Sequence, residues 1–285
     1  MWIVLAFLSA LFAGVTSILS KIGVENINSN LATAIRTFVV LIMAWLIVIF
    51  TGSLEGIGGI SYKTLFFLII SGIATGASWL CYFRAIQLGN VSKVSVIDKT
   101  STIMAILLAF IILKESISFN GVIGIIVIGV GTYMMTVTKK ESIENTSGKS
   151  WIIYAFGSAI FAALTGILGK IGIENIDSNL GTAIRTLVVL IISIGIVVFK
   201  KNYKEIKSIG KKSWVFLTLS GIATGASWLC YYRALQIGSA SVVVPIDKLS
   251  IVVTVVFSSL VLKEKVSIKS WIGLILIVVG TFLLI

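Results

Sequence analysis

Long apolar stretches alternate with short polar segments along the entire chain. Most of these stretches hold about 20 residues, the length that an α-helix needs to cross the roughly 30 Å hydrocarbon core of a bilayer. Strands of a membrane barrel would instead alternate apolar and polar residues over about 10 positions. The pattern therefore predicts an all-α, polytopic membrane protein.

Ten such stretches follow one another, five in each half of the chain. The first half holds residues 2–22, 31–51, 63–88, 91–113 and 117–136, and the second half holds residues 151–171, 180–200, 212–237, 241–262 and 266–284. A polar segment, residues 139–149, separates the halves. We expect ten transmembrane helices, divided into a first unit of residues 1–138 and a second unit of residues 150–285.

The second half repeats the first without a gap, 149 positions later. Residues 71–82 recur unchanged as residues 220–231, and the pair Asp98-Lys99 recurs as Asp247-Lys248. Duplicated halves in an apolar chain are typical of transporters whose two repeats enclose a site near the middle of the membrane.

The charges of the loops predict how the two halves are oriented. Because five is odd, two halves that each cross the membrane five times must enter it from opposite faces. Cytoplasmic loops retain Lys and Arg, and residues 51–63 contain one Lys whereas the equivalent residues 200–212 contain six. We therefore expect inverted repeats in the cell membrane, with a cytoplasmic linker and both termini on the non-cytoplasmic side.

Composition narrows the function. The chain is 58% hydrophobic and only 12% charged, with a net charge of +12, whereas soluble domains are roughly 25% charged. The lysines lie between apolar stretches, where they orient a membrane protein, so we expect no nucleic-acid partner. The chain has no His, and its two cysteines, Cys81 and Cys230, lie inside apolar stretches. We expect no metal, no cofactor and no enzymatic activity.

Two polar turns carry related motifs. Residues 113–118 read Leu-Lys-Glu-Ser-Ile-Ser and precede Gly121, Gly124, Gly129 and Gly131; residues 262–267 read Leu-Lys-Glu-Lys-Val-Ser and precede Gly273 and Gly280. A glutamate before a glycine-studded helix resembles the signature of the drug/metabolite transporter superfamily, EamA type. The resemblance covers the whole chain and implies a ten-helix carrier with both termini outside. It implies no particular substrate, because the family includes exporters of amino acids, nucleobases, drugs and other small metabolites.

Ionisable residues inside the predicted helices are the main candidates for a site, because each costs about 2.5 to 3.5 kcal/mol to insert. Asp98 and Lys99, with their equivalents Asp247 and Lys248, approach the membrane midplane from opposite faces. In one hypothesis the aspartates exchange a proton or bind an ammonium group, and the lysines hold a carboxylate or phosphate. In the other, Asp98 pairs with Lys248 and Asp247 with Lys99 in a purely structural network.

Other polar and aromatic residues are secondary candidates. We expect Arg36 and Arg185 to act as gates or contacts for an anionic substrate, or else to snorkel to the headgroups. Four aromatic residues are expected either in interfacial belts or in the wall of a substrate cavity, namely Trp79, Tyr82, Trp228 and Tyr231. Lys21 and Lys170, at helix ends, are expected to anchor helices at the interface.

Two features predict how the helices pack and bend. The small-xxx-small segments, residues 72–76 and 221–225, favour close helix packing. Pro245, whose equivalent is Val96, is expected to loosen its helix just before Asp247.

Transport is the function that these features favour, because inverted repeats give two interchangeable states around one site. The excess of cations over Asp98 and Asp247 favours a substrate with an anionic group. We expect a secondary-active exporter of a small polar metabolite, an amino acid or related zwitterion or anion, with proton coupling through the aspartates. A non-transporting or lipid-flipping subunit, and a carrier that imports or exports a cationic molecule, are the alternatives. The expected partners are the solute and membrane lipids, with the protein a monomer or homodimer.

Overall fold

The computed structural model describes residues 1–24, 27–88, 94, 97–136, 150–260 and 266–285, and this part of the chain is helical without strands. The first half forms α1 (Trp2–Gly23), α2 (Ser29–Phe50), the short 3₁₀ helix η1 (Ser53–Gly59), α3 (Tyr62–Leu88), α5 (Ser101–Ile112) and α6 (Phe119–Thr136). The second half forms α7 (Ser150–Gly172), α8 (Ser178–Phe199), the 3₁₀ helix η2 (Asn202–Ser208), α9 (Lys211–Ile237), α10 (Ala240–Lys248), α11 (Ser250–Leu260) and α12 (Ile268–Phe282).

Seven segments of the described residues are long and apolar enough to cross a membrane, the last of them being Ala240–Phe257 within α10 and α11. Phe119–Met135 and Ile268–Phe282 are shorter apolar helices. The chain is therefore a helical membrane protein, as the hydropathy pattern predicts. The linker, residues 139–149, and part of the predicted helix at 91–113 lie outside the described residues.

Equivalent residues start equivalent helices in the two halves. Asn28 precedes α2, and its side chain accepts a 3.0 Å hydrogen bond from the backbone N–H of Asn30. Asp177, its repeat equivalent, precedes α8 and accepts a 2.9 Å bond from the N–H of Asn179. Such caps satisfy N–H groups that have no partner inside the helix.

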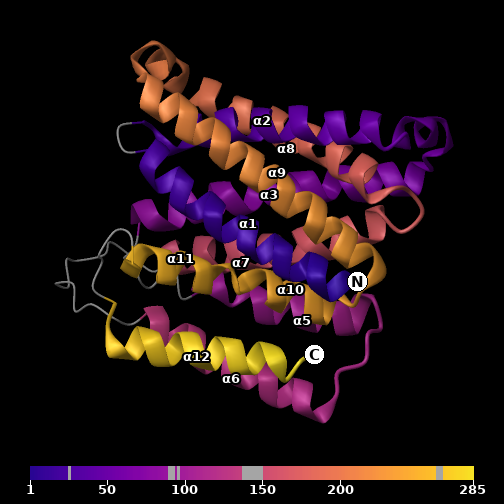
Figure 1. Cartoon of the computed structure of the whole chain (residues 1–285), viewed down its shortest axis with the longest axis vertical. Helices are drawn as coiled ribbons and strands as arrows, with labels where there is room; N and C mark the ends of the chain where they lie inside the picture. The colour runs from indigo at the N-terminus through magenta and orange to yellow at the C-terminus, as the bar shows by residue number, and fades with distance from the viewer. Residues whose placement is uncertain (25–26, 89–93, 95–96, 137–149, 261–265) are drawn as a thin grey trace.

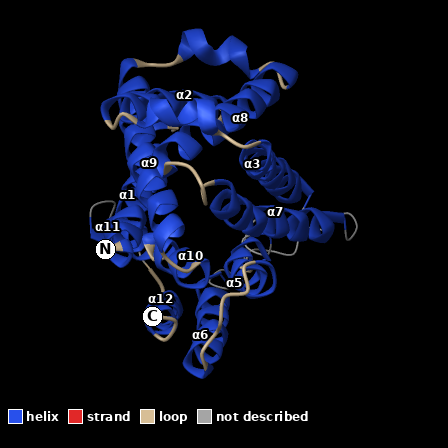
Figure 2. Ribbon diagram, turned by 90° about the vertical axis from the view of Figure 1, so that its right-hand side faces the viewer, coloured by secondary structure: helices blue, strands red, loops and turns tan. Residues whose placement is uncertain are grey.

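The two halves are interleaved rather than packed as separate bodies. The first helix of each half lies against the third helix of the other, so that α1 packs on α9 and α7 packs on α3. Figure 2 shows the first pair on one side of the bundle and the second pair on the other, beneath the layer formed by α2 and α8. Repeat-equivalent hydroxyl contacts join the pairs: Thr16 with Thr224 and Thr75 with Thr165, each at 3.3 Å.

Glycines allow several of these helices to approach closely. A Cβ atom added to Gly72 of α3 would lie 2.8 Å from Cβ of Val188 in α8, and one added to Gly221 of α9 would lie 2.6 Å from Cβ of Val39 in α2. Real Cβ atoms do not come this close, so these positions require glycine. The close packing predicted for residues 72–76 and 221–225 is confirmed.

The helices α6 and α12 form a pair of their own at one edge of the molecule (Figure 1). A Cβ atom on Gly131 would lie 2.6 Å from the carbonyl oxygen of Gly273, and one on Gly280 would lie 2.7 Å from that of Gly124. The glycines that follow the two glutamate motifs thus meet each other across this interface.

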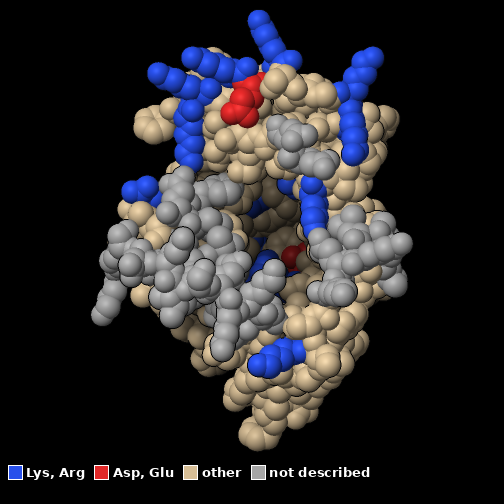
Figure 3. Space-filling view, turned by 90° about the vertical axis from the view of Figure 1, so that its left-hand side faces the viewer, with Lys and Arg blue, Asp and Glu red and all other residues tan. Residues whose placement is uncertain are grey.

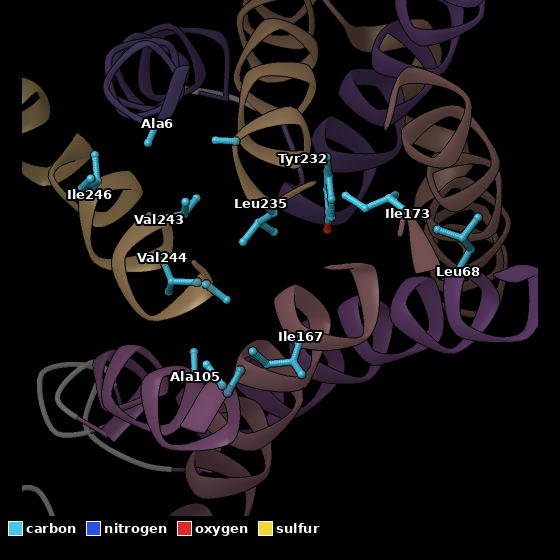
Figure 4. Packing of buried hydrophobic residues seen from close by; sticks show 14 residues of the cluster. Ala6, Leu68, Ala105, Ile167, Ile173, Tyr232, Leu235, Val243, Val244 and Ile246 are labelled. Atoms are coloured by element: carbon cyan, nitrogen blue, oxygen red, sulfur yellow. The ribbon is translucent and has the colours of Figure 1, made fainter. Parts of the chain in front are cut away.

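The largest buried apolar cluster lies where the halves meet. It joins Ile167 of α7, Tyr232 and Leu235 of α9, and Ile246 of α10, among others (Figure 4). All four of these side chains are at most 2% exposed. This cluster fixes α10 against α7 and α9, and so fixes the polar residues at the end of α10.

The ends of the bundle differ. Both termini lie at the same end, at the right of Figure 1. The helix η1, in purple, lies toward that end, and η2, in orange, lies at the opposite one.

Candidate functional site

Both Asp-Lys pairs lie immediately before a break in a helix. The helix α10 ends at Lys248, and the backbone N–H of Leu249 bonds to the carbonyl of Ile246 at 2.9 Å before α11 begins. In the first half, Thr100 makes the equivalent 3.0 Å bond to Ile97 before α5 begins. Discontinuous helices are where carriers with duplicated halves place their ligand sites. Because the break recurs at Thr100 although the chain has a single proline, Pro245 does not by itself explain it.

Each aspartate is held by a serine from the other half of the chain. The Oγ atom of Ser9 in α1 donates to Oδ1 of Asp247 at 2.6 Å and lies 3.2 Å from Oγ of Ser227 in α9. This arrangement recurs around Asp98 with residues of α7 and α3. The equivalent distances are 2.8 Å from Ser158 to Asp98 and 3.4 Å from Ser158 to Ser78.

A cavity of about 280 Å³ lies beside Asp247, and we call it the central cavity. Its polar lining includes Arg185, Asp247 and Lys248. Of the four aromatic candidates, Trp79, Trp228 and Tyr231 line it, whereas Tyr82 packs against the buried cluster of Ala85, Val94 and Ala155. Three of the four aromatic candidates therefore line a cavity, and Tyr82 does not line this one.

Arg185 forms one wall of the central cavity. Its guanidinium carbon lies 5.1 Å from the ring centre of Trp228 and 4.8 Å from that of Tyr232, within cation–π range. Its Nε atom donates to Ser71 at 2.9 Å and its Nη2 atom to Thr75 at 2.6 Å, while Nη1 has no hydrogen-bond partner among the described residues. The residue is 2% exposed, so it does not snorkel to the headgroups. An oriented arginine with one free donor is suited to binding an anionic group.

Arg36, the equivalent of Arg185, has a looser environment. Its Nη2 atom donates to Thr224 at 3.0 Å, and its buried Nε atom has no hydrogen-bond partner in the described part of the chain. It lines a separate cavity of about 230 Å³, which shares the lining residues Trp79 and Trp228 with the central cavity. Repeat-equivalent arginines thus differ in their contacts within one structure.

A third cavity, of about 260 Å³, is lined by both Lys99 and Lys248, and we call it the lysine cavity. Lys248 lines the central cavity as well, so the two adjoin at this residue. Both lysine side chains are exposed. Asp98 and Lys248 form no ion pair in the described structure, and neither do Asp247 and Lys99. The described residues therefore do not form the structural network of Asp98 with Lys248 and Asp247 with Lys99.

A polar cluster lies where α10 begins, and we call it the Glu115 cluster. One carboxylate oxygen of Glu115 accepts hydrogen bonds of 2.8 Å from Lys170 and from the N–H of Ala240, and the other accepts bonds of 2.9 and 2.7 Å from Ser241. Lys170 also donates to the carbonyl of Gly238 at 2.6 Å. Lys170, which was expected to anchor its helix at the interface, forms an ion pair with Glu115 in the described structure. The repeat equivalents of Lys170 and Glu115 are Lys21 and Glu264. Glu264 lies outside the described residues, so this second pair is not described.

The Glu115 carboxyl is acidic for its degree of burial. Burial raises its pKa, but the hydrogen bonds from Lys170, Ser241 and Ala240 outweigh that effect and leave the pKa below its ordinary value. The carboxylate also faces the N-terminus of α10, where the helix dipole favours a negative charge.

Positive charge gathers at the end of the bundle that carries η2. Figure 3 views the molecule from this end and shows Lys and Arg side chains projecting from it around a hollow, inside which further Lys, Arg and acidic side chains are visible. Six exposed lysines of η2 and its flanks lie here, at positions 200, 201, 204, 207, 211 and 212.

Several of these contact residues escaped the sequence analysis. Ser9 and Ser158 belong to no sequence motif. Tyr232 directly follows Tyr231, and only Tyr231 was a candidate from the sequence. One signal for Tyr232 was available, because its equivalent is Phe83 and the repeat therefore departs from identity there. The described residues include no group of three metal-binding side chains.

Comparison with known proteins agrees with the duplication. The sequence profile of the EamA-like transporter family matches twice, over residues 1–137 and 149–285. An uncharacterized transporter from Sinorhizobium sp, named for its position in the cobO 3' region, is 45% identical over 136 residues, which are 48% of this chain and 96% of that protein. That relative thus corresponds to a single repeat.

Longer relatives align with both halves. The uncharacterized transporter YxxF of Bacillus subtilis is 23% identical over 205 residues, covering 71% of this chain and 64% of that protein. A crystal structure of a protein with 14% identity superposes with a TM-score of 0.80 over 98% of this chain and 94% of that one. At this identity the likeness shows the fold alone.

Proposed function

Because the chain belongs to the EamA-like transporter family, we propose that it is a secondary-active exporter of a small polar metabolite, an amino acid or a related zwitterion or anion. One observation carries the proposal. Asp98 and Asp247 each lie at a helix break, each is hydrogen-bonded to a serine of the opposite half, and Asp247 lines the central cavity. Relative movement of the halves would therefore change the surroundings of both carboxylates, which is what proton coupling requires.

We propose further that ten helices cross the cell membrane as two inverted repeats, with both termini on the non-cytoplasmic side. Three features support this topology: the shared end of the two termini, the opposite ends occupied by η1 and η2 (Figure 1), and the lysines that only the second of these loops carries. The lysine-rich end is then cytoplasmic.

The described conformation fits an inward-facing state. The hollow seen in Figure 3 opens at the lysine-rich end. The Glu115 cluster lies toward the other end, because Gly238, just before α10, lies beside Trp2 near the N-terminus. We propose that this cluster closes the outer side, and that it separates when the carrier turns outward.

Reconstitution in proteoliposomes tests the proposal. A panel of amino acids, organic anions and quaternary amines would be followed by counterflow, with and without a pH gradient, in wild type, Asp98→Asn and Asp247→Asn. We expect counterflow of a zwitterion or anion that responds to the gradient in wild type and loses that response in both variants. If no solute on the panel is carried, the transport function is contradicted. If both variants retain the pH response, the role of the aspartates in proton coupling is contradicted.

A further inference from the structure

The lysine cavity brings together two cations that the duplication makes equivalent. Lys99 and Lys248 occupy the same position before a helix break in the two halves, and both side chains are exposed in one cavity of about 260 Å³. Hydroxyl groups of Thr102, Ser250 and Thr254 lie in the same wall. A hydroxyl can rotate to donate a hydrogen bond to an anion.

The two aspartates form no ion pairs with these lysines in the described structure. Asp98 and Asp247 accept their hydrogen bonds from Ser158 and Ser9, and in the described structure neither forms an ion pair with a lysine. Each aspartate adjoins a lysine in sequence, but neighbouring positions on a helix point about 100° apart. Among the described residues, the two ammonium groups of this cavity therefore have no bonded counter-ion.

Two like charges that line one cavity repel each other. Lys99 experiences the charge of Lys248 as well as the opposing charge of Asp98. Inside a membrane protein the effective dielectric constant is far below that of water, so the repulsion is screened less than at a surface. An anion placed between the two ammonium groups removes the repulsion and supplies both of them with a partner.

We propose that the lysine cavity binds a compact dianion, with one negatively charged group on Lys99 and the other on Lys248. The inference rests on the proposed transport function and specifies the substrate class for its site. A dicarboxylate and inorganic phosphate are both compact anions that can carry two negative charges. The cavity volume lies just below the roughly 300 to 1,000 Å³ of typical ligand pockets, which favours a small solute. A lysine acts as a point charge and accepts either kind of anion.

Binding measurements on the purified full-length protein in detergent test this. Tryptophan fluorescence is a suitable signal, because Trp79 and Trp228 line the adjoining central cavity. The probes are succinate, its monomethyl ester as the singly charged match, and inorganic phosphate, each titrated at neutral pH. The variants are Lys99→Gln, Lys248→Gln and the double variant. Lys269→Gln, at an exposed lysine of α12, is the control.

We expect succinate or phosphate to bind wild type at least ten-fold more tightly than the monoester. Each single variant should lose that preference, the double variant should lose binding, and Lys269→Gln should behave as wild type. The relative affinities of succinate and phosphate show whether the site prefers a dicarboxylate or a phosphate. Equal affinity for succinate and its ester with no phosphate binding, or dianion binding that survives in the double variant, overturns the proposal.

A stability measurement guards against misfolded variants. Without ligand, removal of one ammonium group should leave the melting temperature of Lys99→Gln unchanged or raise it, since the repulsion is relieved. A lower melting temperature in both single variants would show that the lysines hold the fold, and would overturn the proposal. Counterflow separates the two claims: a zwitterion that is transported without any dianion binding contradicts the dianion site alone and leaves the transport function standing.

Discussion

Ser9 of α1 donates a 2.6 Å hydrogen bond to Asp247 of α10, a residue 238 positions away in the other half of the chain. Ser158 does the same for Asp98 at 2.8 Å. Each carboxylate is thus held by the first helix of the opposite repeat. Its hydrogen bonding depends on how the two halves are placed, which links the aspartates to any movement between them.

The serine contacts predict the effect of removing one hydroxyl. Hydrogen bonds to charged groups contribute about 1.5 to 3 kcal/mol, so Ser9→Ala and Ser158→Ala should each lower the free energy of unfolding by roughly that amount. Denaturant titration in detergent measures it. Ser193→Ala removes a buried hydroxyl that bonds only to its own helix and should cost less. Equal losses in all three variants would contradict a special role for the aspartate contacts.

Transport should require the planar guanidinium group of Arg185, which donates two hydrogen bonds at once. Arg185→Lys keeps the charge but loses the paired bonds to Ser71 and Thr75, so we expect at least a ten-fold loss of counterflow. Tyr232→Phe keeps the ring that stacks on Arg185 and matches Phe83, and should retain activity, whereas Tyr232→Leu should lose about 0.5 to 2 kcal/mol of cation–π stabilisation. Full activity of Arg185→Lys would contradict this account.

The Glu115 cluster predicts a variant that opens at the outer side. Glu115→Gln removes the charge that holds Lys170 and the start of α10. In a Cys81→Ser, Cys230→Ser background, a reporter cysteine at the fully buried Val243 should react faster with an impermeant maleimide from the non-cytoplasmic side. Glu55→Gln, at an exposed carboxylate in η1, is the matched control. An unchanged rate in Glu115→Gln would show that the cluster does not close this side.

The same cluster predicts the sign of a pH effect. The pKa of Glu115 is lowered in the folded protein, so its stabilisation is complete above the ordinary value near 4.3 and is lost as the pH falls through the folded value. Between pH 5.5 and 8 the reactivity of the Val243→Cys reporter should therefore not respond to pH through Glu115. A Glu115-dependent change within this range would mean that the carboxyl titrates there.

The glycine contacts between α6 and α12 predict a packing defect. A side chain at Gly131 would meet the backbone of Gly273, whereas the nearest atom to a Cβ on Gly129 is the flexible Cδ1 of Ile103 at 3.3 Å. Gly131→Val should destabilise the protein by about 1 to 3 kcal/mol, and Gly129→Ala should be close to neutral. Thermal unfolding of both variants checks this, and equal melting temperatures would contradict the helix pairing.

The hydropathy pattern predicted the helical membrane fold, and the turn motifs predicted the family, because both signals are local in sequence. The contacts of the site were harder to predict for a physical reason. Ser9 and Ser158 are equivalent positions, so a repeated sequence does not reveal which of them meets Asp98. The structure interleaves the halves, and the contact crosses between them. The ion pair of Lys170 could not be predicted for the same reason, since its partner Glu115 belongs to the other repeat.

The most direct measurement compares Glu55 and Lys204, equivalent exposed positions in η1 and η2. Each would be replaced by cysteine in the Cys81→Ser, Cys230→Ser background and labelled in intact cells with an impermeant maleimide. Inverted repeats predict that Glu55→Cys reacts in intact cells, whereas Lys204→Cys reacts only after the membrane is permeabilised. Labelling of both positions from the same side would contradict inverted repeats, and with them the alternating-access mechanism.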